Sequence, residues 1–225
     1  MRGFSSPLPA APFSGEKVKG LALLPGVILW RERFSRAEQQ ALLDAVLTRL
    51  AEAPFYRPRM PGSDKEFSVE ESNFGSLGWV SDKNGYRYQA AHPITGKHWP
   101  DIPPALVELW REIAKAPDAE CCLVNLYRDG ARMGLHQDKD ESDFSAPVVS
   151  VSLGDEALFR IGGNKRRDPT QSVTLHSGDV VMFGGQARMA YHGVDRIRPG
   201  SSSLIPGGGR INLTLRRVTP SALRT

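Results

Sequence analysis

The sequence predicts a mainly β protein of the α+β class, built as an antiparallel sandwich or barrel with flanking helices. Short β-rich runs recur from Cys121 onward, and turn-forming pairs such as Asp129-Gly130 and Gly184-Gly185 separate them. Two stretches with helical spacing precede these runs. Many short strands with frequent turns are typical of antiparallel sandwiches and barrels.

The composition is that of one globular domain. The chain has 225 residues, 29 Lys and Arg against 25 Asp and Glu, and a formal net charge of +4. No stretch approaches the roughly 18 apolar residues of a membrane span, and residues 1–20 lack the apolar segment of a secretory signal. The small positive charge permits a polyanionic partner without requiring one. We expect a cytoplasmic monomer with no membrane partner.

The two cysteines, Cys121 and Cys122, are adjacent. Neighbouring Cα atoms lie about 3.8 Å apart, which is below the usual range for a disulfide. We therefore expect two buried, reduced thiols, as is usual for proteins of the reducing cytoplasm.

The first part of the chain predicts supporting elements. Residues 1–20 carry scattered prolines and are expected to form a flexible tail, whereas Val27–Trp30 is predicted as a strand. Ser35-Arg-Ala-Glu38 is a capping box that begins an amphipathic helix over about residues 36–51. A second helix follows Pro103-Pro104. Between the helices, residues 56–100 predict hairpins and loops rather than core.

The β-rich part runs from residue 121 to residue 218 and is followed by a short tail, residues 219–225. The expected strands are Cys121–Tyr127, Val148–Leu153, Ala157–Ile161, Val173–Leu175, Val180–Phe183 and Ile211–Val218. The loop Arg198–Gly209 is rich in glycine and serine, and we expect it to be long and flexible.

His136-Gln-Asp138 is the strongest chemical signal in the sequence. Alternate residues of an extended chain face the same side, so this imidazole and carboxylate can bind one cation. His192 and His176 are the candidates for a third ligand, since each lies near a predicted turn or strand. Two histidines and one carboxylate form the facial triad of non-haem Fe(II) oxygenases. A lone His-x-Asp is more often an ordinary surface pair.

A polar stripe follows the last predicted strand. In Arg210-Ile-Asn212-Leu-Thr214-Leu-Arg216 polar and apolar residues alternate, so each kind occupies one face. The ordinary interpretation is a half-exposed strand whose polar face meets water. If that face lies inside a small barrel, its guanidiniums need anionic partners, such as a bound carboxylate. Asn125 and Tyr127 form a similar pair on the Cys121–Tyr127 strand.

The sequence resembles the AlkB family of Fe(II)- and 2-oxoglutarate-dependent nucleic-acid repair dioxygenases from about residue 26 to residue 217. The motifs that carry the resemblance are Asn125-Leu-Tyr127, His136-Gln-Asp138-Lys-Asp140-Glu141, Pro147–Gly154, Gly178-Asp179-Val-Val, Tyr191-His192-Gly193 and Arg210-x-Asn212-x-Thr214-x-Arg216. The resemblance implies a double-stranded β-helix, or jelly roll. Residues 121–218 would form the dioxygenase core, and residues 21–120 an N-terminal extension with supporting helices.

The resemblance also implies which side chains hold the cofactors. His136, Asp138 and His192 would bind Fe(II), which favours His192 over His176. Arg210 would hold the far carboxylate of 2-oxoglutarate. The rest of the cosubstrate site would consist of Asn125, Tyr127, Asn212, Thr214 and Arg216. O₂ would be the second cosubstrate.

Residues 56–100 resemble the family's nucleotide-recognition lid, with Gly78-Trp79 and Gly85-Tyr86-Arg87-Tyr88 as its motif. The substrate would be held by Trp79 stacking on a flipped, methylated base, Tyr86 and Tyr88 at the phosphate or base edge, Asp140 at the exocyclic amino group, and Arg166 at the nucleotide. Packing of the aromatic rings against the sheet is the simpler interpretation of the same pattern.

Glu70-Glu71 depart from the family pattern, which has small apolar residues and a methionine at this point. Negative charge beside a polyanion is unfavourable unless Lys65 or Lys83 offsets it. The departure therefore affects the expected preference for single- or double-stranded nucleic acid and the affinity for it, more than the expected reaction.

The function implied by the resemblance is oxidative demethylation of N-alkylated bases, such as 1-methyladenine and 3-methylcytosine, in single- or double-stranded DNA and also in RNA. The reaction would couple decarboxylation of 2-oxoglutarate, to succinate and CO₂, to release of formaldehyde. Two alternatives stay open. One is a hydroxylase of RNA or protein substrates that uses the same triad, and the other is a non-catalytic module that binds damaged bases.

Overall fold

The computed structural model describes residues 19–128 and 130–220. Within them lie α1 (Arg36–Leu50), α2 (Pro104–Ile113) and the short 3-10 helix η1 (Gly185–Ala187). The strands are β1 (Leu21–Leu24), β2 (Val27–Trp30), β3 (Glu70–Phe74), β4 (Gly78–Asp82), β5 (Gly85–Gln89), β6 (Cys121–Tyr127), β7 (Met133–His136), β8 (Val148–Gly154), β9 (Glu156–Ile161), β10 (Gln171–Leu175), β11 (Val180–Phe183), β12 (His192–Arg198) and β13 (Arg210–Arg216). The predicted tails, residues 1–20 and 219–225, fall outside the described residues except at 19–20 and 219–220.

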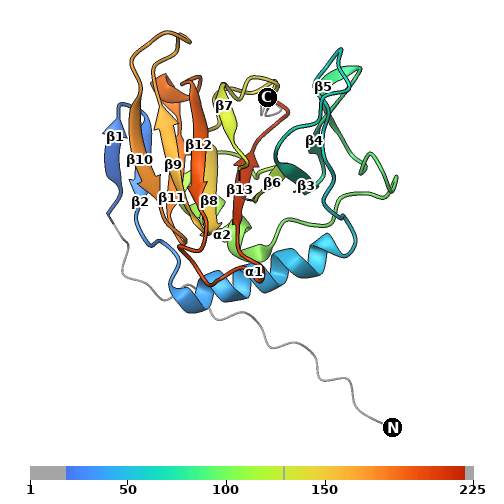
Figure 1. The fold of residues 1–225 in the computed structure, drawn as a ribbon. Coiled ribbons are helices and arrows are strands. Elements are labelled where there is room, and N and C mark those ends of the chain that lie inside the picture. The colour runs from blue at the N-terminus through green and yellow to red at the C-terminus, as the bar shows by residue number, and fades with distance from the viewer. Residues whose placement is uncertain (1–18, 129, 221–225) are drawn as a thin grey trace.

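Two antiparallel sheets form the body of the molecule (Figure 1). The large sheet has the strand order β1-β2-β11-β8-β13-β6-β3, and the small sheet has the order β10-β9-β12-β7. Apart from the consecutive pairs β1-β2 and β9-β10, neighbours in the two sheets are distant in the sequence, as expected for a jelly roll. The predicted mainly β, α+β fold with flanking helices is thus confirmed. None of the described helices is long and apolar enough to span a membrane.

The strands expected from Cys121 onward are all present, with ends shifted by a few residues. The sequence does not predict β7 or β12, the two strands that carry the histidines of the candidate metal site. Both are poor in the β-branched and aromatic residues that favour strands. They are stabilised instead by their pairing, since β12 lies between β9 and β7 in the small sheet.

The capping box predicted at Ser35 is confirmed. The Ser35 hydroxyl accepts from the backbone N–H of Glu38, at 3.4 Å, and the Glu38 carboxylate accepts from the backbone N–H of Ser35, at 2.7 Å. The second predicted helix starts at Pro104, because proline supplies a suitable φ and needs no hydrogen-bond partner in the first turn.

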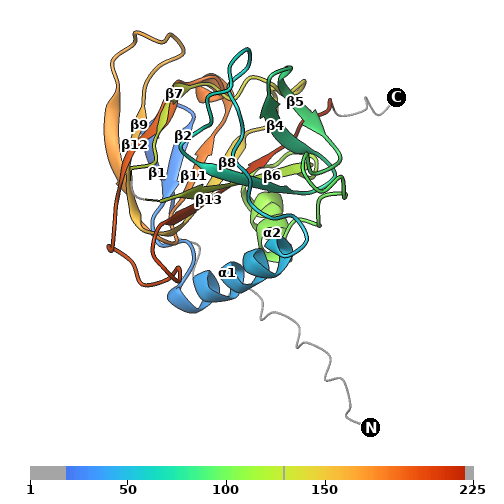
Figure 2. The same cartoon turned by 45° about the vertical axis from the view of Figure 1, so that its right-hand side comes forward.

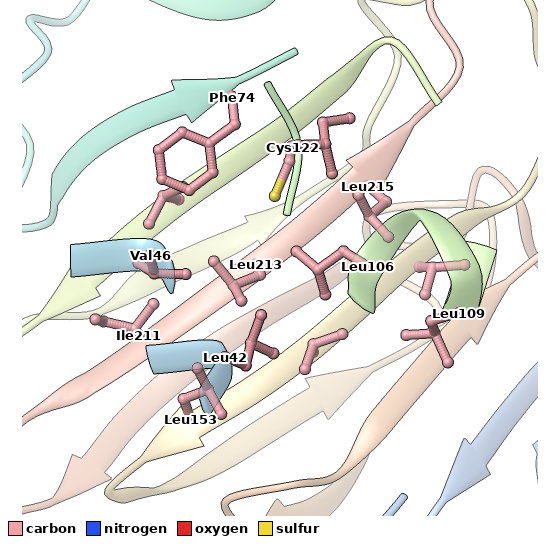
Figure 3. Close-up of a cluster of buried hydrophobic side chains, with 14 of the residues drawn as sticks. Leu42, Val46, Phe74, Leu106, Leu109, Cys122, Leu153, Ile211, Leu213 and Leu215 are labelled. Carbon is pink, nitrogen blue, oxygen red and sulfur yellow. The ribbon is translucent and has the colours of Figure 1, made fainter. Parts of the chain in front are cut away.

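Both helices cover the outer face of the large sheet (Figure 2). Figure 3 shows apolar side chains from the two helices packed against those of the strands. The labelled residues are Leu42 and Val46 of α1, Leu106 and Leu109 of α2, and Phe74, Cys122, Leu153, Ile211, Leu213 and Leu215 of the sheet. This core fixes the large sheet, and its opposite face is left free to meet the small sheet.

The structure shows which face of β13 carries the apolar residues and which carries the polar ones. Ile211, Leu213 and Leu215 belong to the core beneath the helices. The polar residues of the same strand therefore point to the other face, between the two sheets. There they lie beside a second core, to which both sheets contribute. The interpretation of this stripe as a water-exposed face is wrong.

The prediction that residues 56–100 form only hairpins and loops is also wrong for β3. This strand pairs with β6 and forms the edge of the large sheet, and Phe74 is fully buried in the core under the helices. The remainder agrees with the prediction: β4 and β5 form a separate two-stranded hairpin at the right of Figure 1. The predicted lid is therefore anchored to the sheet by β3.

The loop Arg198–Gly209 is not the flexible segment that its glycines and serines suggest. The buried carboxylate of Asp155 accepts hydrogen bonds from the backbone N–H groups of Gly200, Ser202 and Gly209. Leu204 and Ile205 of the loop are buried in the core beneath the helices. The hydrogen bonds to Asp155 and the burial of these two apolar side chains together hold the loop, and both depend on partners outside the loop.

Both cysteines are buried and free, as expected. Burial raises the pKa of the Cys121 thiol to about 12. The thiols therefore stay protonated at neutral pH and act as small apolar side chains.

Candidate metal centre and active-site cavity

Three side chains meet where β7 ends and β12 begins. His136 ends β7, Asp138 follows two residues later, and His192 starts β12, directly opposite His136 in the antiparallel pairing. Nε2 of His136 lies 3.8 Å from Oδ1 of Asp138, and Nε2 of His192 lies 3.8 Å from Oδ2. One ligand atom from each residue lies within 4.8 Å of the others. The predicted grouping of His136, Asp138 and His192 is thus present.

The two imidazoles are oriented by their own backbone. Nδ1 of His136 lies 2.9 Å from the carbonyl oxygen of Gly134, and Nδ1 of His192 lies 2.9 Å from that of Ala190. A carbonyl oxygen can only accept, so each Nδ1 carries the proton. Each Nε2 then presents its lone pair to the centre of the cluster, as a metal ligand must.

The electrostatics of the cluster also suit a cation. Burial and the neighbouring His136 lower the pKa of His192 to about 4, so this imidazole is neutral at neutral pH. Burial alone would raise the pKa of Asp138, but the Arg216 guanidinium and the two histidines hold it well below its usual range. His192 and Asp138 therefore offer the cluster a neutral imidazole and an ionised carboxylate.

A buried ionic network holds Asp138 in place. Nη2 of Arg216 donates to Oδ1 of Asp138 at 2.8 Å, and Nη1 of Arg188 donates to the Asp138 carbonyl oxygen at 2.7 Å. Glu141 joins the two arginines: it lies 3.0 Å from Arg188 and 3.4 Å from Arg216, and it also accepts from the Tyr88 hydroxyl. Such networks are stable when each charge is paired.

Glu141 and Arg188 have no role in the sequence interpretation. Glu141 lies within the His136–Glu141 motif, and this position in the sequence could have indicated that it belongs to the site. Nothing near Arg188 in the sequence indicates its role, because its partners lie more than 40 residues away.

The second buried arginine, Arg210, has a different environment. It is 1% exposed, and of its guanidinium only Nη2 has a partner, the Ser152 hydroxyl at 2.8 Å. Nε and Nη1 are buried without a hydrogen-bond partner among the described residues. Burial lowers the pKa of Arg210 to about 10, so the group is still a cation at neutral pH. A buried cation with two free donors is an arrangement suited to an anion.

The other residues of the predicted cosubstrate site lie on β13, the strand of Arg210, or on its neighbour β6, and line the active-site cavity, whereas Arg210 itself is not among the lining residues. Asn125 and Tyr127 pair directly with Asn212 and Arg210 across the β6–β13 ladder. Asn212 donates to Ser150 and accepts from Thr214. Asn125, Tyr127, Asn212, Thr214 and Arg216 all line the same cavity as the triad.

This cavity has a volume of about 770 Å³ and extends from the triad to the lid. On the lid side it is lined by Trp79 and Tyr86, whose rings stack with centroids 5.3 Å apart. Nε1 of Trp79 donates to the exposed carboxylate of Asp140 at 2.7 Å. Arg166 lies on the rim and donates to the Leu135 carbonyl oxygen at 3.0 Å. Tyr88 is not among the lining residues, because its hydroxyl points to Glu141.

His176, the rival third ligand, lies in a separate cluster. Its Nδ1 is 3.2 Å from Nη1 of Arg31 and 3.7 Å from Asp179, and its Nε2 is 3.7 Å from Glu156. Among the described residues, His136, Asp138 and His192 are the one group of this kind with a metal-binding arrangement. The geometry thus favours His192.

The two glutamates that depart from the family pattern have different partners from those expected. Glu70 pairs with Arg57 at 3.0 Å rather than with Lys65 or Lys83. Glu71 is 1% exposed and lines the cavity. It is therefore part of the cavity wall and not of the outer surface.

The residues present fit a ferrous ion and a dicarboxylate. Three protein ligands leave coordination positions open, and Oδ2 of Asp138 is buried without a hydrogen-bond partner among the described residues. A keto acid on the metal with its distal carboxylate at Arg210 would give partners to both buried groups. The donor set and the unpartnered atoms thus agree with a 2-oxoglutarate-dependent iron site.

Comparisons with known proteins agree with this geometry. Residues 20–216 match the model of the 2OG-Fe(II) oxygenase superfamily. The chain is 57% identical over 202 residues to the alpha-ketoglutarate-dependent dioxygenase AlkB homolog of Caulobacter vibrioides, covering 88% of this chain and 90% of the relative. It is 42% identical over 196 residues to the alpha-ketoglutarate-dependent dioxygenase AlkB of Escherichia coli, covering 85% and 89%.

A solved structure, that of OsALKBH1, is similar throughout its length. It superposes with a TM-score of 0.73 at 30% sequence identity, covering 88% of this chain and all of that one. The shared jelly roll, the match along nearly the whole chain and the His-Asp-His cluster all lead to the same assignment. The chain belongs to the AlkB family of Fe(II)- and 2-oxoglutarate-dependent dioxygenases.

Proposed function

We propose that the protein repairs alkylated nucleic acid by oxidative demethylation of bases such as 1-methyladenine and 3-methylcytosine. Its substrates would be single- or double-stranded DNA and also RNA. The reaction consumes 2-oxoglutarate and O₂ and yields succinate, CO₂, formaldehyde and the unmodified base. The observation that carries this proposal is the single cavity that joins the His-Asp-His cluster to Trp79 and Asp140.

The side chains in the cavity wall, and Arg210 beside them in the sheet, have separate tasks in this proposal. His136, Asp138 and His192 hold Fe(II), and Arg210 receives the distal carboxylate of 2-oxoglutarate through its two free donors. When bound, the iron and its cosubstrates supply the oxidising power that attacks the N-alkyl carbon. Arg216 keeps Asp138 ionised and fixes its orientation. Asn125, Tyr127, Asn212 and Thr214 complete the wall that orients the cosubstrate.

The lid end of the cavity would receive the base. Trp79 is held at the mouth by its hydrogen bond to Asp140 and offers an aromatic face for stacking. Bases alkylated at these nitrogens carry a positive charge, so the exposed Asp140 carboxylate favours them electrostatically. Tyr86 and Arg166 lie on the rim, where the sugar-phosphate backbone would pass. The Tyr88 hydroxyl is bonded to Glu141, so Tyr88 would act on the site through Glu141.

The division of the chain and its setting are also part of the proposal. Residues 121–218 form the catalytic core, and residues 21–120 form an extension that carries the lid, residues 56–100. Because β1, β2 and β3 of the extension belong to the large sheet, these parts are functional units of one folded body. We propose that the protein acts as a cytoplasmic monomer.

Mass spectrometry tests the proposal directly. An oligonucleotide that contains 1-methyladenine is incubated with the protein, Fe(II) and 2-oxoglutarate. We expect loss of the mass of one methylene unit, as methyl is replaced by hydrogen, together with equimolar formaldehyde. Asp138→Ala is the control, which should abolish turnover and leave oligonucleotide binding largely intact.

The alternatives give different results in the same experiment. A hydroxylase of peptides would release succinate faster with a peptide than with the methylated oligonucleotide. A binding module without activity would bind the oligonucleotide tightly and give no formaldehyde. Normal formaldehyde release by the Asp138→Ala variant would show that the ligand assignment is wrong.

A further inference from the structure

Glu71 is a buried acid on the cavity wall that none of the steps above uses. It lies on β3, directly opposite Asn125 of β6 in the antiparallel ladder. Both side chains line the cavity, so both point to the same face of the sheet. Directly opposite residues have Cβ atoms about 4.5–5.5 Å apart. A glutamate and an asparagine are long enough to meet across that gap.

Both side chains also have an oxygen atom without a partner. Oε2 of Glu71 and Oδ1 of Asn125 are buried, and neither has a hydrogen-bond partner among the described residues. A buried acceptor without a donor costs about 1–3 kcal/mol. An amide oxygen and a carboxylate oxygen are both acceptors, so they can bond only if the carboxyl carries a proton.

The surroundings of Glu71 favour the protonated form. Burial raises its pKa to about 8, although Arg216 of β13 acts in the opposite direction. Arg216 is already engaged by Asp138 and Glu141. The other titratable groups that face Glu71 are Tyr127 of β6 and Tyr56, and burial raises the pKa of both phenols, so both are neutral.

We propose that the protonated carboxyl of Glu71 donates a hydrogen bond to Oδ1 of Asn125 and thereby turns the Asn125 amide nitrogen toward 2-oxoglutarate. An asparagine amide presents either a donor or an acceptor, and only the donor suits an anion. Glu71 selects the donor by occupying the oxygen. It is a positioning residue, and the inference rests on the proposed role of Asn125 in the cosubstrate site.

The proposal predicts a pH dependence with a definite sign. Below about pH 8 the Glu71 carboxyl is protonated and the hydrogen bond is present. Above that pH the carboxyl ionises, the donor is lost, and a negative charge lies near a dianionic cosubstrate. The affinity for 2-oxoglutarate should therefore fall as the pH rises through about 8.

Binding of 2-oxoglutarate to the Mn(II)-loaded protein, measured by calorimetry without O₂, tests this. Glu71→Met removes the donor, and we expect about tenfold weaker binding at neutral pH. Glu71→Gln retains a neutral donor, so its affinity should stay near that of the unchanged protein. Because glutamine does not ionise, the affinity of Glu71→Gln for 2-oxoglutarate should not fall above about pH 8. Glu70→Gln is the matched control, because this neighbour pairs with Arg57 outside the cavity.

The outcomes separate this inference from the proposed function. If Asn125→Ala does not weaken 2-oxoglutarate binding, the cosubstrate assignment fails. If Asn125→Ala weakens binding but Glu71→Met does not, only the role of Glu71 fails. Should Glu71→Met prove unfolded by circular dichroism, the pH profile of Glu71→Gln decides, and a profile identical to that of the unchanged protein would refute the proposal.

Discussion

At the scale of single residues, two buried arginines of β13 have acquired opposite tasks. Arg216 is paired with Asp138 and Glu141, so its charge is neutralised within the protein. Arg210 has one hydroxyl partner and two free donors. Both guanidiniums follow from the same alternating pattern, and only their neighbours distinguish them. Arg216 thus serves the metal ligand, whereas Arg210 is suited to bind an anion from outside.

This difference predicts the effect of removing Arg210. In Arg210→Ala the distal carboxylate loses a charged, hydrogen-bonded partner worth about 1.5–3 kcal/mol. The KM for 2-oxoglutarate should therefore rise about 10- to 150-fold, with a smaller change in kcat at saturation. Steady-state kinetics with varied 2-oxoglutarate provide the measurement. Arg198→Ala is the control, since this arginine is exposed and pairs with Glu156. An unchanged KM would remove Arg210 from the site.

At the scale of elements, the lid is a hairpin that is attached to the rest of the protein at three points. The preceding strand β3 is part of the large sheet, and Trp79 of β4 donates a hydrogen bond to Asp140 in the segment after β7. The hydroxyl of Tyr88 in β5 donates a further hydrogen bond, to Glu141. Both acceptors lie within three residues of Asp138, so the lid and the metal site share one segment of chain. The position of the base is thereby coupled to that of the iron.

The same element predicts how Trp79 contributes to binding. Stacking of one base on an aromatic side chain is worth roughly 1–3 kcal/mol, so Trp79→Ala should weaken binding of a methylated oligonucleotide about 5- to 150-fold. Trp79→Phe keeps a ring but loses the bond to Asp140, and its loss should be smaller. Fluorescence anisotropy with a labelled oligonucleotide checks both variants. Equal affinity of Trp79→Ala and the unchanged protein would contradict a stacking role.

At the scale of the whole molecule, charge is distributed unevenly with respect to the cavity. Its lining includes five acidic residues and five Lys or Arg residues. Among the exposed ones, two are acidic, Glu66 and Asp140, and four are basic: Lys65, Arg132, Lys139 and Arg166. Together they place positive charge where the nucleic-acid backbone would pass, although the net charge of the chain is only +4. The positions of the charged residues therefore say more about a nucleic-acid partner than the net charge of the chain does.

This distribution predicts a salt dependence. Removing one side chain that neutralises a phosphate of a single strand should reduce the slope of log K against log salt concentration by about 0.7. Arg132→Ala is expected to lower the slope by about that amount and to leave catalysis on a bound base unaffected. Lys115→Ala provides the comparison, because Lys115 follows α2, which packs on the opposite face of the large sheet. Equal slopes for the two variants would show that the nucleic-acid backbone does not pass Arg132.

Much of this organisation could be predicted from the sequence. The capping box at Ser35, the strands from Cys121 onward and the pairing of His136 with Asp138 depend on residues near one another in the chain, so local spacing indicates them. The resemblance to the AlkB family extended the prediction to His192 and Arg210. The strands β3, β7 and β12 were not predicted, and the loop Arg198–Gly209 was predicted wrongly as flexible, because the stability of all four comes from distant partners.

By itself, then, the sequence determined the two helices, six of the core strands and which of their side chains share a face, since these depend on periodicities of two and 3.6 residues. Only the tertiary structure decided which face turns inward, which arginine is left without a partner, and that Glu71 is sealed opposite Asn125. Those outcomes depend on which strands pair and in what register. Pairing brings together residues that are far apart in the chain, and no local pattern records their distances.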